Sequence, residues 1–182
     1  LSPEQRKLRN RLRAHSRQLG DRLDERKGTQ DIERLTSECA YEHWHRMLFA
    51  RFLAENHLLM DDDPHNPVSV TLAECTELAP THKEKPNSGW ELAAIFASRM
   101  LPQIFRNESP VFKFLLPTEH RTQLEQLVES LPTEVFTASD SLGWVYQFWQ
   151  SRKKDIINKS EVKIGAMELP AVTQLFTEPY MV

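Results

Sequence analysis

The feature that most constrains the fold is the stretch DIERLTSECAYEHWHRMLFARFLAENHLLM, residues 31–60, whose apolar side chains recur at helical spacing. They form two neighbouring stripes on one helix, a width that requires burial on two sides. The spacing therefore predicts a central helix with other helices packed around it. The stripes consist of Tyr41, Trp44, Leu48 and Phe52, and of Phe49, Leu53 and Met60.

Three capping boxes predict where further helices begin. In each, a Ser or Thr that can cap the first turn is followed three residues later by Gln or Glu, as in SPEQ at residues 2–5. This first helix should continue to Gly28, because glycine readily adopts the left-handed conformation that ends a helix. The second box, at residues 71–74, predicts a short helix reaching about Ala79, and the third lies at residues 88–91.

The rest of the chain continues the helical pattern. After the third box, WELAAIFASRMLPQIF contains Pro102, which lacks the backbone N–H that a helix needs. The helix should therefore break within a residue or two of Leu101. Later helices are expected at Thr118–Leu131, with Leu127 on the buried face, and from about Asp140 to Ile157. The predicted fold is all-α, a multi-helix domain with irregular loops and at most one very short strand, near residues 68–70.

Composition favours one soluble intracellular domain. The 182 residues are 40% hydrophobic and 27% charged, enough for one cooperative core and too few for two large domains. Cys39 and Cys75 lie outside any metal-binding or disulfide pattern, which is typical of reduced cytosolic thiols. No apolar run approaches the roughly 18 residues that a membrane span requires. A cytoplasmic protein without a membrane partner is therefore predicted.

The first helix is strongly basic. Residues 1–27 hold nine Lys or Arg and four Asp or Glu, a net charge of +5, whereas the remaining residues carry −8. Arg9, Arg11 and Arg13 are candidates for contacts with DNA phosphates, which would make binding depend steeply on salt. The alternative is that they form only the solvated face of an amphipathic helix. The sequence leaves both interpretations open.

The last long helix is rich in aromatic residues that could stack on nucleic-acid bases. Their helical spacing and apolar neighbours favour a place in the core instead. These residues are Trp144, Tyr146, Phe148 and Trp149.

No metal site is predicted, although two histidines and an acidic run invite one. His43 and His45 are two residues apart on a helix, a rotation of about 200° that points the imidazoles apart. The run DDD at residues 61–63, followed by His65, lacks the alternation and the glycine of a calcium loop, which favours a solvated turn.

A third candidate metal site is the Glu-x-Lys triplet at residues 161–163, which is similar to the ligand triplet of metal-dependent nucleases, with Asp140 and Asp155 upstream. Such sites need their carboxylates on adjacent strands, and here the two aspartates bracket a helical segment. A solvated charge cluster is therefore the favoured interpretation.

Four strings, taken in order, resemble the N-terminal region of large bacterial adenine-specific N6 DNA methyltransferases of type II restriction-modification and phage-exclusion systems. They are YEHWHRMLFARFLAENHLLM, WELAAIFASRMLPQIF, DSLGWVYQFWQSRKKDIINKS and ELPAVTQLFTEPYMV. The resemblance covers most of the chain from about residue 40. It implies S-adenosylmethionine as the cofactor and double-stranded DNA as a partner of the full-length enzyme, with restriction or phage-defence subunits as further partners.

The resemblance also assigns a role to the closing stretch TQLFT, residues 173–177. In the family, a similar motif precedes the Rossmann-like catalytic domain and lies against S-adenosylmethionine. The cofactor contacts that it implies are those of Gln174, Phe176, Thr177 and Glu178. Thr177 can also cap a helix whose free backbone N–H groups suit a ligand carboxylate. Relatives place Pro directly after this Thr, whereas Glu178 intervenes here.

The catalytic motifs of that family are absent from these 182 residues, which contain neither the Gly-containing cofactor loop nor the Asn/Asp-Pro-Pro-Tyr/Phe motif. Residues 1–169 are therefore expected to form a helical N-terminal domain, and residues 170–182 the start of a truncated methyltransferase domain. The chain alone should be inactive, supporting the catalytic domain and touching the DNA backbone. The alternative is a non-enzymatic helical module that binds a partner protein through an apolar groove.

Overall fold

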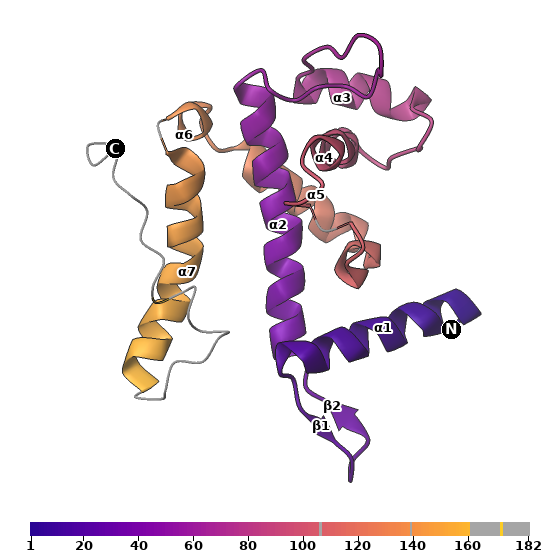
Figure 1. Ribbon diagram of the computed structural model, residues 1–182, viewed down its shortest axis with the longest axis vertical. Coiled ribbons are helices and arrows are strands. Elements are labelled where there is room, and N and C mark those ends of the chain that lie inside the picture. Colours follow the sequence, from indigo (N-terminus) through magenta and orange to yellow (C-terminus); the bar gives the residue numbers. More distant parts are fainter. Residues whose placement is uncertain (106, 139, 161–171, 173–182) are drawn as a thin grey trace. The chain divides into compact units, whose positions relative to one another are not determined.

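The computed structural model of the protein describes residues 1–105, 107–138, 140–160 and 172 (Figure 1). Helices dominate these residues, so the predicted all-α fold is confirmed. Two compact units divide the chain, residues 1–132 and residues 133–182, and each is described by itself. The helices of the first unit are α1 (Pro3–Leu19), α2 (Glu33–Glu55), α3 (Leu72–Leu78), α4 (Gly89–Met100) and α5 (Thr118–Glu129), with the 3-10 helices η1 (Ala79–Thr81) and η2 (Pro110–Lys113). Its two strands are β1 (Leu23–Asp24) and β2 (Thr29–Gln30). The second unit contains α6 (Glu134–Thr137) and α7 (Ser141–Ser160).

Helix α1 begins as predicted and ends earlier than predicted. The Ser2 hydroxyl accepts the Gln5 backbone N–H at 3.1 Å, and the Gln5 side chain accepts the Ser2 N–H at 2.8 Å, so the first capping box is complete. The helix ends at Gly20, whose φ of 100° lies in the left-handed region, and the predicted end at Gly28 was wrong. Either glycine can end a helix, and the one met first along the chain does so.

A short β-hairpin follows α1 and was not predicted. Leu23 pairs with Gln30 and Asp24 with Thr29 in antiparallel register, and Gly28, with φ of 63°, lies in the connecting turn. Two residue pairs are too few to produce a visible alternation of apolar and polar side chains. The strand expected near residues 68–70 is reduced to a single bridge between Ser69 and Met60.

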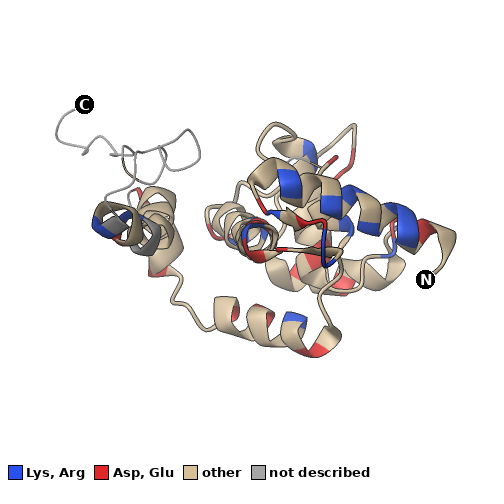
Figure 2. Cartoon of the chain, turned by 90° about the horizontal axis from the view of Figure 1, so that it is seen from below, with Lys and Arg blue, Asp and Glu red and all other residues tan. Residues whose placement is uncertain are grey.

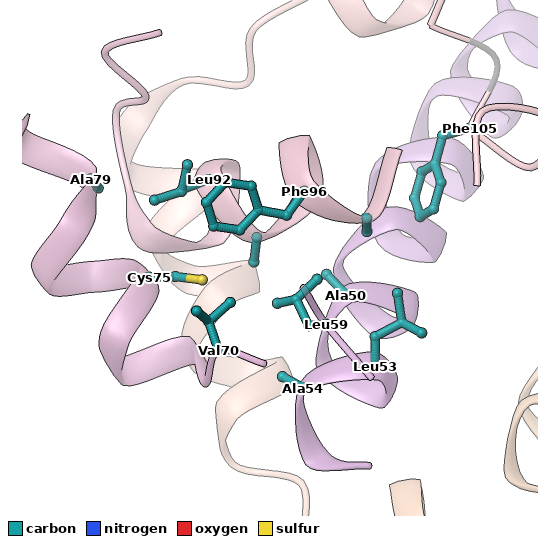
Figure 3. Packing of buried hydrophobic residues seen from close by; sticks show 12 residues of the cluster. Ala50, Leu53, Ala54, Leu59, Val70, Cys75, Ala79, Leu92, Phe96 and Phe105 are labelled. Atoms are coloured by element: carbon teal, nitrogen blue, oxygen red, sulfur yellow. The ribbon is translucent and has the colours of Figure 1, made fainter. Parts of the chain in front are cut away.

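Helices α2, α3 and α4 enclose the core of the first unit (Figure 3). The predicted central helix α2 contacts α1, α4, α5 and η2, so it is packed on several sides. Met60, which the sequence places on its apolar stripe, lies beyond the end of the helix at Glu55. The buried cluster consists of Ala50, Leu53, Ala54, Leu59, Val70, Cys75, Ala79, Leu92, Ala93, Phe96, Ala97 and Phe105.

The other helix boundaries of the first unit follow local signals. The capping box at Thr71 and Glu74 is complete at the start of α3. At the start of α4 the box is only half formed, because the Ser88 hydroxyl accepts the Glu91 N–H at 3.2 Å while the Glu91 carboxylate accepts from Asn87. Helix α4 ends at Met100, two residues before Pro102, which confirms the predicted break.

The predicted buried face of α5 was partly wrong. Val128 is buried, but Leu127 is 66% exposed. The end of this helix is instead fixed by a buried cation, because the Arg51 guanidinium from α2 donates to the carbonyls of Val128 and Leu131, the second at 2.7 Å. Arg51 also pairs with Glu55 one turn along α2. A buried cation therefore satisfies backbone carbonyl groups at the end of α5.

The second unit contains the aromatic helix, α7, preceded by the four-residue helix α6. Trp144 is 57% exposed and Phe148 is 81% exposed, so the prediction that both lie in the core was wrong. Tyr146 and Trp149 are half-buried.

No helix in the described residues is both long and apolar enough to cross a bilayer. The domain boundary predicted between residues 169 and 170 lies outside the described residues and stays a prediction.

Candidate nucleic-acid interface

Four arginines of α1 form one continuous basic stripe, which we call the Arg stripe: Arg6, Arg9, Arg13 and Arg17. At about 100° per residue, they fall within an arc of about 80° and extend along about 16 Å of helix axis. All four are exposed. Lys and Arg, blue in Figure 2, recur along α1, the helix nearest the label N. The stripe therefore presents four positive charges to solvent in one direction.

Arg11 lies on another side of the helix. It is rotated by about 200° from Arg9, and its Nη2 donates to the carbonyl oxygen of Glu108 at 3.0 Å. Arg9 and Arg13 thus share a surface, and Arg11 instead ties α1 to the segment before η2. The three arginines predicted to contact DNA phosphates therefore lie on two sides of α1, and their contact with DNA stays a prediction. The rotation of 100° per residue would have placed Arg17, two turns beyond Arg9, on the same side of the helix.

The face of α1 next to the stripe packs against the rest of the first unit. Ser16 is fully buried, and Leu8, Leu12, His15 and Leu19 are half-buried on the same face. This face lies next to the stripe on the helical circumference, and α1 uses it to contact α2 and η2. The stripe is therefore held outward by a packed helix rather than carried on a loose terminus.

Asp21 fixes the junction between α1 and α2. Its carboxylate accepts the backbone N–H groups of Arg34 and Leu35, at 2.9 and 3.0 Å, and the Ser16 hydroxyl at 2.6 Å. Ile32, the N-cap of α2, makes no side-chain cap, so Asp21 supplies one from the end of α1. Burial raises the pKa of Asp21, but the three hydrogen bonds outweigh it and hold that pKa below its usual value.

The capping role of Asp21 matters for the charge of the surface. Its carboxylate is buried against the positive end of α2, so it does not neutralise the stripe from outside. Of the nine Lys and Arg in residues 1–27, the four of the Arg stripe thus share one outer side of α1.

The acidic turn at residues 61–63 differs from the solvated turn that was predicted. Asp61 and Asp63 accept backbone N–H groups within the turn. Asp62 instead forms ion pairs with Lys83 and Arg99 and lies 3.5 Å from His82. The hydrogen bond from Lys83, then those from Arg99 and His82, lower the pKa of Asp62 to about 2. This cluster joins the turn to the loop after η1 and to α4, and Oδ2 of Asp62 contacts both Lys83 and Arg99.

The remaining metal candidates are separated in the structure. The His45 ring stacks on Tyr41 at 5.3 Å, whereas His43 meets the edge of Phe112 at 6.3 Å. Asp140 precedes α7 and Asp155 lies near its far end, about 22 Å along the axis. Within the residues that the structure describes, no group of three His, Cys, Asp or Glu could hold a metal ion.

The residues predicted to contact a cofactor, Gln174, Phe176, Thr177 and Glu178, lie outside the described residues, as do those of the Glu-x-Lys triplet at 161–163. Their role stays a prediction.

Comparison with known proteins finds two curated relatives. The adenine-specific methyltransferase BrxX of Escherichia coli O9:H4 (strain HS) is 28% identical over 190 residues, a match covering 89% of this chain and 16% of the relative. The adenine-specific methyltransferase PglX of Lacticaseibacillus casei (strain Zhang) is 28% identical over 88 residues, covering 45% of this chain and 7% of the relative. No family model matches the chain, and no solved structure matches it significantly.

These matches support a distant relationship to adenine-specific methyltransferases. The chain spans only 16% and 7% of the length of the two relatives.

Proposed function

We propose that this chain is the helical part of a DNA methyltransferase that transfers a methyl group from S-adenosylmethionine to N6 of adenine. The distant relationship to adenine-specific methyltransferases, which extends over 89% of the chain, supports this assignment. The 182 residues contain no Asn/Asp-Pro-Pro-Tyr/Phe motif, so the methyl transfer itself is assigned to residues elsewhere in such an enzyme. The proposal places the enzyme in the cytoplasm, with restriction or phage-defence subunits as its partners.

In this proposal the helical part supports the catalytic domain and contacts the DNA backbone through the Arg stripe. The observation that carries the DNA contact is the alignment of four exposed arginines on one side of a packed helix. Arginine matches phosphate oxygens in charge and in hydrogen-bond geometry. Such contacts position a protein on DNA without reading bases, so the stripe would contribute affinity and orientation rather than site specificity.

Cofactor binding is proposed for the closing stretch. Gln174, Phe176, Thr177 and Glu178 would form one wall of the S-adenosylmethionine site, with the other walls in the catalytic domain. A ligand held from one side keeps most of its surface in water, so the isolated chain is not expected to bind the cofactor measurably.

The DNA contact is tested by the salt dependence of binding to a fluorescent DNA duplex. Replacing Arg9, Arg13 and Arg17 by Ala should reduce the slope of log K against log salt by about 2.7, because each lost phosphate contact removes about 0.9. Arg11→Ala removes the same kind of charge from another side of α1 and should leave the slope nearly unchanged. A triple variant with the wild-type slope would mean that the Arg stripe is only the solvated face of α1.

A second candidate function is protein binding, which the exposed aromatic residues of α7 favour. Trp144 and Phe148 are one turn apart on the same side of that helix and both are exposed. If α7 binds a protein, Trp144→Ala and Phe148→Ala should abolish that binding while leaving the salt slope for DNA unchanged. If the DNA assignment fails in the salt experiment and this one succeeds, the chain acts as an interaction module.

A further inference from the structure

The β-hairpin between α1 and α2 carries a second group of exposed basic residues. Arg22, just before β1, and Arg26 and Lys27, in the turn after β1, are all exposed. Asp24 accepts the backbone N–H groups of Arg26 and Lys27 at 3.0 and 3.2 Å through Oδ1, and its Oδ2 lies 3.9 Å from Lys27 Nζ. Glu25 is the other exposed carboxylate of this segment. Residues 22–30 thus carry three cationic and two anionic side chains, a net charge of +1.

Side-chain and backbone hydrogen bonds hold the hairpin against the last turns of α1. The Gln30 side chain accepts from Arg17 Nη1 at 3.2 Å and donates to the carbonyl oxygen of Arg13 at 3.0 Å. The Asp31 N–H donates to the carbonyl of Arg22 at 2.9 Å, closing the base of the hairpin. The hairpin thus begins where the Arg stripe ends, and Gln30 joins the two.

Figure 1 shows that the hairpin leaves the end of α1 beside the start of α2 and does not continue the line of the helix. The buried cap made by Asp21 lies at the same corner, so hydrogen bonds hold both α2 and the hairpin to the end of α1. Two basic segments that meet at a fixed corner can contact separate stretches of a phosphate backbone, which a single straight helix cannot.

We infer that the hairpin is a second phosphate-contacting arm, and that duplex DNA seated on the Arg stripe also contacts Arg22, Arg26 and Lys27. This inference rests on the proposed function, since it takes the Arg stripe as the first arm. Gln30 then acts as a positioning residue: it orients Arg17 and fixes the hairpin relative to the stripe.

The test uses the whole chain and the same fluorescent duplex. Arg26→Ala combined with Lys27→Ala should lower the salt slope by about 1.8, because two phosphate contacts are lost. The matched control, Lys154→Ala with Lys159→Ala, removes the same charge from α7 in the other unit and should leave the slope unchanged. Circular dichroism and the melting temperature of both double variants should equal those of the wild type, because the side chains replaced in the hairpin are exposed.

The outcomes separate the two proposals. If the Arg-stripe variant loses slope and the hairpin variant does not, the hairpin inference is overturned and the proposed function stands. If the wild-type chain shows no salt-dependent binding, both fail. An equal loss of slope in the hairpin variant and in the α7 control would mean that net charge alone matters, which also overturns the inference.

Gln30→Ala tests the joint itself. It removes no charge, so the salt slope should stay the same while the affinity falls several-fold, because Arg17 and the hairpin must then be ordered on binding. An affinity equal to that of the wild type would show that Gln30 does not position Arg17 and the hairpin for DNA binding.

Discussion

Replacing Asp21 by Ala should lower the free energy of unfolding by about 2–4 kcal/mol, because it removes three hydrogen bonds to one carboxylate. Two of the bonds satisfy N–H groups of Arg34 and Leu35 in the first turn of α2, and the third holds the buried Ser16 hydroxyl. Without the carboxylate, these donors are left at the positive end of a 23-residue helix. The junction that holds the Arg stripe in place would therefore loosen.

Urea denaturation followed by circular dichroism measures this loss. Asp24→Ala is the matched control, since Asp24 also accepts two backbone N–H groups but is exposed on the hairpin. It should cost less than about 1 kcal/mol, as surface substitutions usually do. If Asp21→Ala were as stable as Asp24→Ala, the cap would not be what fixes the junction.

Replacing Gly89 by Ala should destabilise the first unit by about 3 kcal/mol, because there is no room for the added methyl group. A Cβ built on Gly89 would lie 2.3 Å from Oγ1 of Thr76 and 2.7 Å from its Cα and backbone N. The side-chain oxygen can rotate away, but the backbone atoms cannot move unless α3 shifts away from α4. The same packing encloses Cys75 and Leu92 in the core.

Gly143→Ala gives the contrast. The three atoms nearest to its Cβ would be carboxylate atoms of Asp140, the closest at 2.6 Å, and that side chain can turn aside. Because alanine favours a helix by roughly 0.5–1 kcal/mol over glycine, this variant should be close to neutral or slightly stabilising. Thermal melting of the two variants should separate them clearly. A Gly89→Ala protein with the same melting temperature as the wild type would show that α3 and α4 leave room for the added methyl group.

Features that act over a few residues could be predicted from the sequence. The capping boxes at Ser2 and Thr71 and the break before Pro102 depend only on neighbours within one helical turn, and all three are present. The predicted end of α1 was wrong because Gly20 and Gly28 can each end a helix. The sequence does not show how far along α1 the half-buried face still packs against the rest of the first unit, and therefore which glycine ends the helix.

Features that depend on distant contacts could not be predicted. The buried Arg51 donates to carbonyls of Val128 and Leu131, far along the chain, and no local pattern indicates that a cation occupies the space. The exposure of Phe148 likewise depends on what surrounds α7 rather than on its own periodicity.

The candidate site was partly predictable for the same reason. Composition identified a basic first helix, and simple rotation about its axis would have separated Arg11 from Arg9 and Arg13. The contribution of Arg17 depends on Gln30, which reaches α1 only because the hairpin folds back against it. Sequence periodicity carries no signal for a contact of that kind.

The most direct measurement of the central claim is disulfide cross-linking to a DNA duplex that carries a thiol tethered to one backbone phosphate. Arg13→Cys places the thiol on the Arg stripe, and Arg11→Cys places an equally exposed thiol on another side of α1. The native thiols should contribute little, because burial raises the pKa of both Cys39 and Cys75, the second to about 12. If the Arg stripe contacts DNA, Arg13→Cys should form a cross-link and Arg11→Cys should form little or none. Equal cross-linking of the two, or none from Arg13→Cys, would contradict a DNA contact through the stripe.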